Sequence, residues 1–198
     1  MQDIEVGEMK QLLFVNACVR EDSRTYELSR RYLERIGRIS MECQIEEIRL
    51  SELELKPLDA AALRQRDGDI GAGRLDRQRY RLAYQFAAAD EIVIAAPYWD
   101  CLFPAILRLY LEQICVTGIA FAYGEDGALV KLCHADRLVY ITTCGGFLPE
   151  KSAVESLIRE MGRLFSIDDV RFYAAEGLDV YPDRVQEILD GTLDAMES

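Results

Sequence analysis

Short apolar runs alternate along this chain with segments of helical periodicity, and this alternation limits the folds open to the chain more than any other feature. A short continuous apolar run is typical of a strand covered on both faces, as strands in parallel sheets are. One further run alternates apolar and polar residues, which indicates a strand at a sheet edge. The predicted strands are LLFVNAC (12–18), QIEEIRL (44–50, the edge-like strand), EIVIAAP (91–97), RLVYITT (137–143) and VRFYAAE (170–176).

Helical patterns fill most of the intervals between these strands. Strands that alternate with helices form a parallel sheet covered on both faces, so we predict an α/β, doubly wound five-stranded parallel sheet in the order 2-1-3-4-5. The predicted helices cover about residues 25–37, 75–89, 105–114, 151–165 and 182–196.

Two intervals do not fit this alternation. Residues 51–73 are rich in charge and glycine, and we expect a loop with one short helical turn there. Residues 115–135 contain two short β-like pieces around the turn signal GEDG. The 198 residues are expected to form one domain (1–198), with residues 1–10 as a flexible N-terminal extension.

The charge balance narrows the range of partners. The chain has 23 Lys and Arg residues against 35 Asp and Glu residues, a formal net charge of −12. A surface this acidic repels phosphate backbones and anionic membranes, which argues against nucleic acid as a partner. No segment has the roughly 18 to 20 apolar residues that cross a bilayer, and the N-terminus is unlike a signal peptide, so we expect a cytoplasmic protein with no membrane insertion.

The cysteines and the histidine give no sign of a metal site. The chain has six cysteines, no CxxC pair, and one histidine, His134, which lies apart from any cysteine cluster. Zinc sites need closely spaced Cys and His ligands, so we expect free thiols and no metal. His134 comes just before a predicted strand and is expected at the surface or an interface.

Three loops follow predicted strands, at the edge where open parallel sheets bind ligands. A hydroxyl and a guanidinium at a helix start can hold an anion, although a Ser or Thr there is usually only a cap. Aromatic side chains can stack on a planar ring, or they can pack in the core. Paired glycines let the backbone approach a ligand closely, or they form a tight turn. The candidate residues are Ser23, Arg24 and Thr25 in the first loop, Pro97, Tyr98, Trp99, Asp100 and Cys101 in the second, and Thr143, Cys144, Gly145 and Gly146 in the third.

Taken in order, these segments resemble the flavodoxin-like NAD(P)H:quinone oxidoreductases and the FMN-dependent NADH-azoreductases. The turn SRT resembles the phosphate turn of that family, and the segment 91–127 resembles its flavin loop, the helix after it and the substrate-side hairpin. YITTCGG and FYAAEGLDVY resemble the regions of its fourth and fifth strands. The matches run from about residue 11 to 182, so the resemblance implies a flavodoxin-like fold for nearly the whole chain.

The resemblance also implies a function. FMN would be the cofactor, NADH or NADPH the co-substrate and hydride donor, and a quinone or similar flat molecule the acceptor, in a ping-pong reaction without a dedicated acid or base. By position, Ser23, Arg24 and Thr25 would bind the FMN phosphate, 97–101 would line the ring and ribityl chain, and 143–146 would meet the pyrimidine edge. A homodimer with the pocket at its interface is implied as well. Asp100, Cys101 and Cys144 stand where azoreductases often have Asn, Phe and Arg, which puts azo-dye reduction in question.

Two alternatives stay open at this point. Cys18 and Arg24 have the Cys-x5-Arg spacing of a low-molecular-weight phosphatase, with Cys18 as the nucleophile. Against it, Glu21 and Asp22 would repel a phosphate dianion, the loop lacks glycine, and the chain has no Asp-Pro dipeptide to supply an acid. A non-catalytic flavin-binding or electron-carrier module is the other alternative, and the 115–135 segment argues for a substrate cleft instead.

Overall fold

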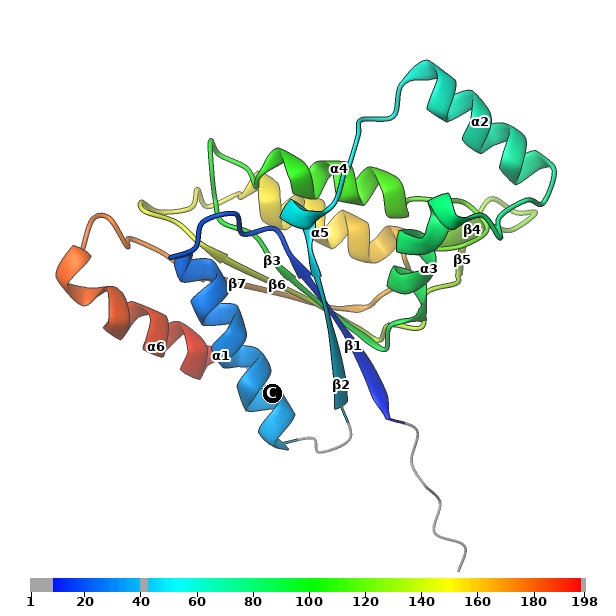
Figure 1. Cartoon of the computed structure of the whole chain (residues 1–198). Coiled ribbons are helices and arrows are strands. Elements are labelled where there is room, and N and C mark those ends of the chain that lie inside the picture. Colours follow the sequence, from blue (N-terminus) through cyan, green and yellow to red (C-terminus); the bar gives the residue numbers. More distant parts are fainter. Residues whose placement is uncertain (1–8, 40–42, 197–198) are drawn as a thin grey trace, which may run out of the picture.

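A computed structural model describes residues 9–39 and 43–196, and its centre is a five-stranded parallel sheet (Figure 1). The strand order is β2-β1-β3-β6-β7, which is the predicted order 2-1-3-4-5 when only the strands of this sheet are counted. The predicted doubly wound fold is therefore confirmed. The five strands are β1 (Lys10–Asn16), β2 (Cys43–Arg49), β3 (Glu91–Ala95), β6 (Arg137–Thr143) and β7 (Asp169–Ala175).

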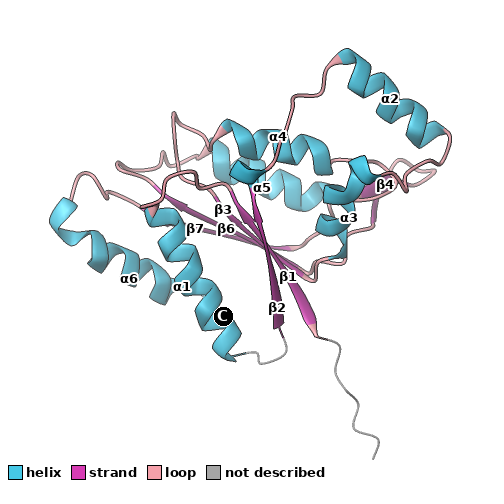
Figure 2. Ribbon diagram, viewed as in Figure 1, coloured by secondary structure: helices cyan, strands magenta, loops and turns pink. Residues whose placement is uncertain are grey.

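Helices cover both faces of this sheet (Figure 2). In β1 the alternate residues Leu13 and Val15 belong to one apolar cluster, and Leu12 and Phe14 belong to the other. Because successive strand residues point to opposite faces, a strand buried on both sides reads as a continuous apolar run. One face is covered by α1 (Arg24–Ile39) and α6 (Val185–Ala195), and the other by α3 (Arg81–Ala88), α4 (Ala105–Ile114) and α5 (Ala153–Leu164).

The segment 115–135 contains the expected hairpin. Strands β4 (Phe121–Tyr123) and β5 (Leu129–Lys131) pair antiparallel around the GEDG turn. Gly127 has a φ of +79°, a left-handed conformation that glycine adopts without strain. The hairpin lies outside the main sheet, beside α3 in Figure 1.

The prediction for residues 51–73 is wrong. This segment contains a helix of 12 residues, α2 (Ala60–Gly71), after the 3₁₀ turn η1 (Leu50–Glu52), and α2 projects away from the sheet (Figure 1). Asp59 caps the helix, since its carboxylate accepts a hydrogen bond from the N–H of Ala62 at 2.7 Å. Asp69 is its one fully buried residue, so α2 has no apolar stripe that a search for helical periodicity could detect.

Several element boundaries also differ from the predicted ones. The helix expected from residue 75 begins with the 3₁₀ turn η2 (Gln78–Tyr80), and the last helix is preceded by η3 (Pro182–Arg184). Strand β1 ends at Asn16, so Cys18 lies two residues beyond the strand that it was predicted to end.

Part of the expected N-terminal extension, residues 1–8, lies outside the described residues, whereas Lys10 already belongs to β1. His134 is exposed, as predicted. In the part of the chain that the structure describes, no helix is both long and apolar enough to span a membrane.

Candidate functional site

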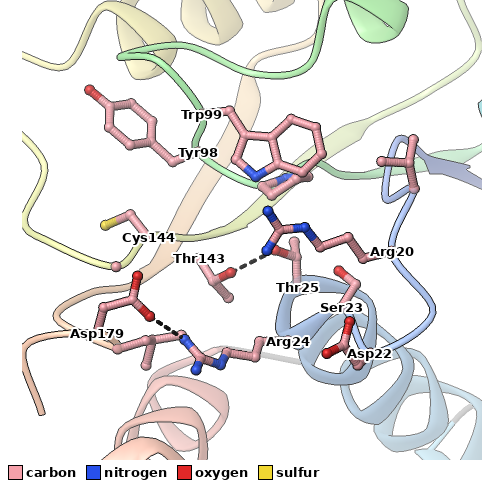
Figure 3. Close-up of a pocket in the computed structure, with 14 residues that line it drawn as sticks. Arg20, Asp22, Ser23, Arg24, Thr25, Tyr98, Trp99, Thr143, Cys144 and Asp179 are labelled. Atoms are coloured by element: carbon pink, nitrogen blue, oxygen red, sulfur yellow. Dashed lines mark hydrogen bonds and ion pairs between the residues drawn. The ribbon is translucent and has the colours of Figure 1, made fainter. Parts of the chain in front are cut away.

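A cavity of about 300 Å³ opens where β1, β3 and β6 end (Figure 3). This volume is at the lower end of the range for small-molecule sites, and the position is the switch point at which open α/β sheets bind ligands. Nine predicted residues line the cavity: Ser23, Arg24, Thr25, Pro97, Tyr98, Trp99, Thr143, Cys144 and Gly145. Asp100, Cys101 and Gly146 do not.

The first loop leads directly into α1. The hydroxyl of Ser23 accepts a hydrogen bond from the N–H of Tyr26 at 3.2 Å, and the Ser23 carbonyl accepts one from Glu27 at 3.0 Å. Ser23 therefore caps the helix. The N–H groups of Arg24 and Thr25 lie in the first turn, where a helix offers no acceptor, and together with the helix dipole they favour an anion at this end.

Thr25 ties the first loop to the third. Its hydroxyl lies 2.7 Å from that of Thr143, in a buried hydrogen bond in which either residue can donate. Thr25 is 1% exposed, so this hydroxyl fixes the distance between the start of α1 and the end of β6. A predicted ligand-binding hydroxyl thus has a structural partner within the protein.

Arg24 is also engaged by a partner within the protein. Its Nη1 donates to Oδ1 of Asp179 at 2.8 Å, across the cavity from α1 to the loop after β7 (Figure 3). A Cβ atom on Gly145 would lie 2.1 Å from Oδ2 of Asp179, so any larger residue at position 145 would displace this carboxylate. The N–H of Asp179 donates to the Gly145 carbonyl at 2.9 Å, which holds the two loops together.

The second loop turns sharply after Trp99. Trp99 and Leu102 exchange backbone hydrogen bonds of 2.8 Å in both directions, and the two residues between them, Asp100 and Cys101, have φ values of +48° and +65°. A two-residue turn with both central residues left-handed matches the twist of a tight hairpin. Asp100 and Cys101 are therefore at an exposed tip, and this is why they do not line the cavity.

Tyr98 and Trp99 form the aromatic side of the site. The Tyr98 N–H donates to the Thr143 carbonyl at 3.0 Å, which joins the second loop to the third. Burial raises the pKa of the Tyr98 hydroxyl, and the neighbouring Cys101 and Cys144 thiols add to this effect. The guanidinium carbon of Arg20 lies 5.4 Å from the centre of the Trp99 ring, a cation–π distance.

The third loop presents Cys144 and Gly145 to the cavity. The Cys144 thiol donates to the Gly146 carbonyl at 3.1 Å, and burial raises its pKa to about 11. The Gly146 carbonyl also accepts a hydrogen bond from the N–H of Gly177 at 2.6 Å, and Gly146 does not line the cavity. Cys144 is thus a protonated thiol at neutral pH.

Cys18 has none of the properties of a nucleophile. It is buried, its thiol lies 3.9 Å from the Ala95 carbonyl, and it does not line the cavity. Burial raises its pKa to about 11, whereas a nucleophilic cysteine needs a lowered pKa. Cys18 therefore does not supply the thiolate nucleophile that the phosphatase alternative requires.

Five residues of the cavity were missed by the sequence reasoning. Two of them, Leu178 and Asp179, follow β7, and the sequence already contained a signal for them. Because β7 is parallel to β6, the loop at its carboxyl end reaches the same edge of the sheet. The other three, Val19, Arg20 and Asp22, are interior residues of the first loop, where no cap or glycine marks a site.

The sheet order and the cavity at its switch point define a flavodoxin-like α/β protein. The family model described as "Flavodoxin-like fold" matches residues 10–198, and the chain belongs to this family. Within it, the chain is 34% identical to "FMN-dependent NADH:quinone oxidoreductase 2" of Clostridium acetobutylicum over 193 residues, which cover 94% of this chain and 96% of that one. The corresponding protein of Clostridium beijerinckii is 33% identical over 195 residues, which cover 94% and 96%.

Solved structures share the same fold. An azoreductase from Bacillus anthracis str. Sterne superposes with a TM-score of 0.82 at 22% identity, over 94% of this chain and 96% of that one. An FMN-dependent NADH-azoreductase from Bacillus anthracis str. Ames Ancestor, in complex with FMN, gives a TM-score of 0.78 at 21% identity, over 94% and 97%. At such identities the likeness concerns the fold.

Proposed function

We propose that this chain is an FMN-dependent NADH oxidoreductase that reduces quinones or similar flat acceptors. The observation that carries the proposal is the cavity itself, which combines the N-terminus of α1 with the aromatic side chains of Tyr98 and Trp99 at one switch point. The curated relatives, more than 30% identical over nearly the whole chain, bear the name of this activity.

The residues of the cavity fit FMN in type. The first turn of α1 with Ser23 offers N–H groups and a positive dipole end to a phosphate. Tyr98 and Trp99 offer flat apolar surface to the isoalloxazine ring. In the third loop the N–H of Gly145, which donates to no acceptor within the described residues, offers a hydrogen bond to the pyrimidine edge.

FMN, when bound, supplies the hydride and electron chemistry, and the protein supplies binding and orientation. Tyr98 and Cys144 have raised pKa values and stay protonated at neutral pH, so neither acts as a base. Asp100 points to solvent at the tip of its turn, so its charge does not oppose electron density on the ring. The protein's part in the reaction is thus to hold two flat molecules in succession over one surface.

Three finer points belong to the same proposal. We place the protein in the cytoplasm, on the grounds that its six cysteines are free thiols, which a reducing compartment maintains. NADPH could replace NADH if the cavity admits its additional phosphate. A homodimer, implied by the resemblance, would bring a second surface to the open side of the cavity.

The test uses the purified full-length chain. FMN binding is followed by quenching of flavin fluorescence, and oxidation of NADH and NADPH is followed with menadione as acceptor, with and without added FMN. FMN-dependent NADH oxidation that requires menadione supports the proposal. FMN binding without turnover would favour the electron-carrier alternative, and no FMN binding at micromolar concentration would refute both.

A further inference from the structure

The first loop carries two arginines, and the structure gives them different surroundings. Arg24 is held by Asp179 through an ion pair of 2.8 Å. Arg20 has no carboxylate partner within the described residues 9–39 and 43–196, and its guanidinium lies over the Trp99 ring. Figure 3 shows Arg20 reaching from the first loop toward Trp99, while Arg24 reaches in another direction to Asp179.

The Arg24–Asp179 pair connects two sides of the cavity. It joins the start of α1 to the loop after β7, and that loop is bonded to the third loop by Leu178 N–H to Cys144 carbonyl (3.2 Å) and Asp179 N–H to Gly145 carbonyl (2.9 Å). A guanidinium already paired with a carboxylate attracts a second anion less, because the two negative charges repel each other. Arg24 is therefore poorly placed to bind a phosphate.

Arg20 is better placed than Arg24 to bind a phosphate. Its contact with Trp99 is a cation–π interaction at a solvent-accessible site, worth about 0.5–1 kcal/mol. A bidentate bond from a guanidinium to a phosphate is stronger than such a contact and has a geometry that only arginine provides. Arg20 lines the same cavity as Ser23 and Thr25, so an anion at the start of α1 lies within the reach of its side chain.

We propose that Arg20 is the residue that binds the phosphate of the flavin, and that Arg24 is a positioning residue whose ion pair with Asp179 holds the third loop against α1. This inference rests on the proposed function and corrects the expectation that Arg24 itself binds the phosphate. Arg20 then determines the preference for a flavin that carries a phosphate monoester over one that lacks it.

The experiment compares FMN with riboflavin, which has the same ring and ribityl chain but no phosphate. Dissociation constants for both are measured by fluorescence quenching for the wild type, Arg20→Ala, Arg20→Lys, Arg24→Ala and Asp179→Ala, with the circular dichroism melt of each variant as a control for folding. Arg20→Ala is expected to weaken FMN binding by about 10- to 100-fold, the equivalent of one charge-assisted hydrogen-bonding pair, and riboflavin binding by less than about twofold. Arg20→Lys is expected to restore part of the loss.

The positioning role makes a different prediction. The double variant Arg24→Ala/Asp179→Ala removes the pair without a change in net charge, and it is expected to weaken FMN and riboflavin by the same factor, so the preference for FMN is kept. Each single variant shifts the preference through the charge that it leaves behind: Asp179→Ala is expected to raise the preference for FMN, because a negative charge is removed, and Arg24→Ala to lower it, because the Asp179 carboxylate is left unpaired. A preference for FMN that disappears in the double variant and persists in Arg20→Ala would overturn the assignment.

The assignment of Arg20 and the proposed NADH-oxidising activity can fail independently of each other. If the wild type binds FMN with the Arg20-dependent preference but does not oxidise NADH, the assignment of Arg20 holds and the proposed activity fails. If NADH oxidation is found but FMN and riboflavin bind equally well to the wild type, the activity holds and the assignment fails.

Discussion

Replacing Gly145 by alanine tests how tightly the cavity loops are packed. The new Cβ would lie 2.1 Å from Oδ2, 2.7 Å from Cγ and 3.1 Å from Cβ of Asp179. Ordinary contacts between carbon atoms begin at about 3.5 Å, so the Asp179 side chain must move. Its backbone cannot follow easily, because its N–H is bonded to the Gly145 carbonyl at 2.9 Å.

The magnitude follows from two contributions. Rotation of the carboxylate breaks the exposed pair with Arg24, which is worth up to about 1 kcal/mol. The Cβ–Cβ contact of 3.1 Å that remains must open by a few tenths of an ångström and costs less than about 1 kcal/mol. We expect Gly145→Ala to lower the free energy of unfolding by about 1 kcal/mol in a urea titration, and to lower Tm by about 2–4 °C for a chain of this size.

Two further variants make this test specific. Gly146→Ala is the matched control, because no atom lies within 4 Å of a Cβ on Gly146, and it is expected to be neutral or up to about 1 kcal/mol stabilising. In an Asp179→Ala background, Gly145→Ala is expected to cost less than about 1 kcal/mol, since only the Cβ contact remains. If Gly145→Ala costs nothing, or costs as much without the Asp179 carboxylate, the steric reasoning is refuted.

Three other predictions concern separate parts of the molecule. Since the pKa of Cys18 is raised to about 11, iodoacetamide at pH 7.5 should leave Cys18 unmodified in the native protein by peptide mapping, and rapid labelling would contradict its burial. The hydrogen bond from Arg171 lowers the pKa of Asp169 in the folded protein. Asp169 therefore stabilises the fold above the pKa of an unfolded aspartate, and this stabilisation is lost as the pH falls through its lower folded pKa. In urea titrations, Asp169→Asn should lower the free energy of unfolding by about 1 kcal/mol at pH 7 and by little near pH 2. A Cβ on Gly162 would lie 2.3 Å from a methyl group of Val170, so Gly162→Ala should lower the free energy of unfolding by about 1–3 kcal/mol. An unchanged urea midpoint would contradict this expectation, since it would mean that β7 moves aside without cost.

The parallel sheet could be predicted because its signal is local. Each central strand is buried on both faces, and a run such as RLVYITT must therefore be apolar over its whole length, which a single sequence shows directly. The switch-point rule then places the loops after β1, β3 and β6 at one edge. For this reason nine of the residues singled out from the sequence line one cavity.

The features that the sequence did not reveal depend on contacts between distant residues. Helix α2 carries no apolar stripe, and its buried Asp69 is paired with Arg74 and Arg77, so periodicity gave no sign of the helix. The outward turn of Asp100 and Cys101 depends on two positive φ values; aspartate adopts this conformation more often than most residues do, but cysteine gives no sign of it.

The sequence by itself determined the class of fold and the edge at which a ligand can bind, because buried positions are apolar and their spacing along the sequence distinguishes strands from helices. Only the tertiary structure decided the partners of the two arginines. Arg24 and Asp179 are 155 residues apart, and their ion pair exists because β7 lies in the same sheet as β1. A charged side chain can turn toward any neighbour within reach, and the fold alone determines which neighbours those are.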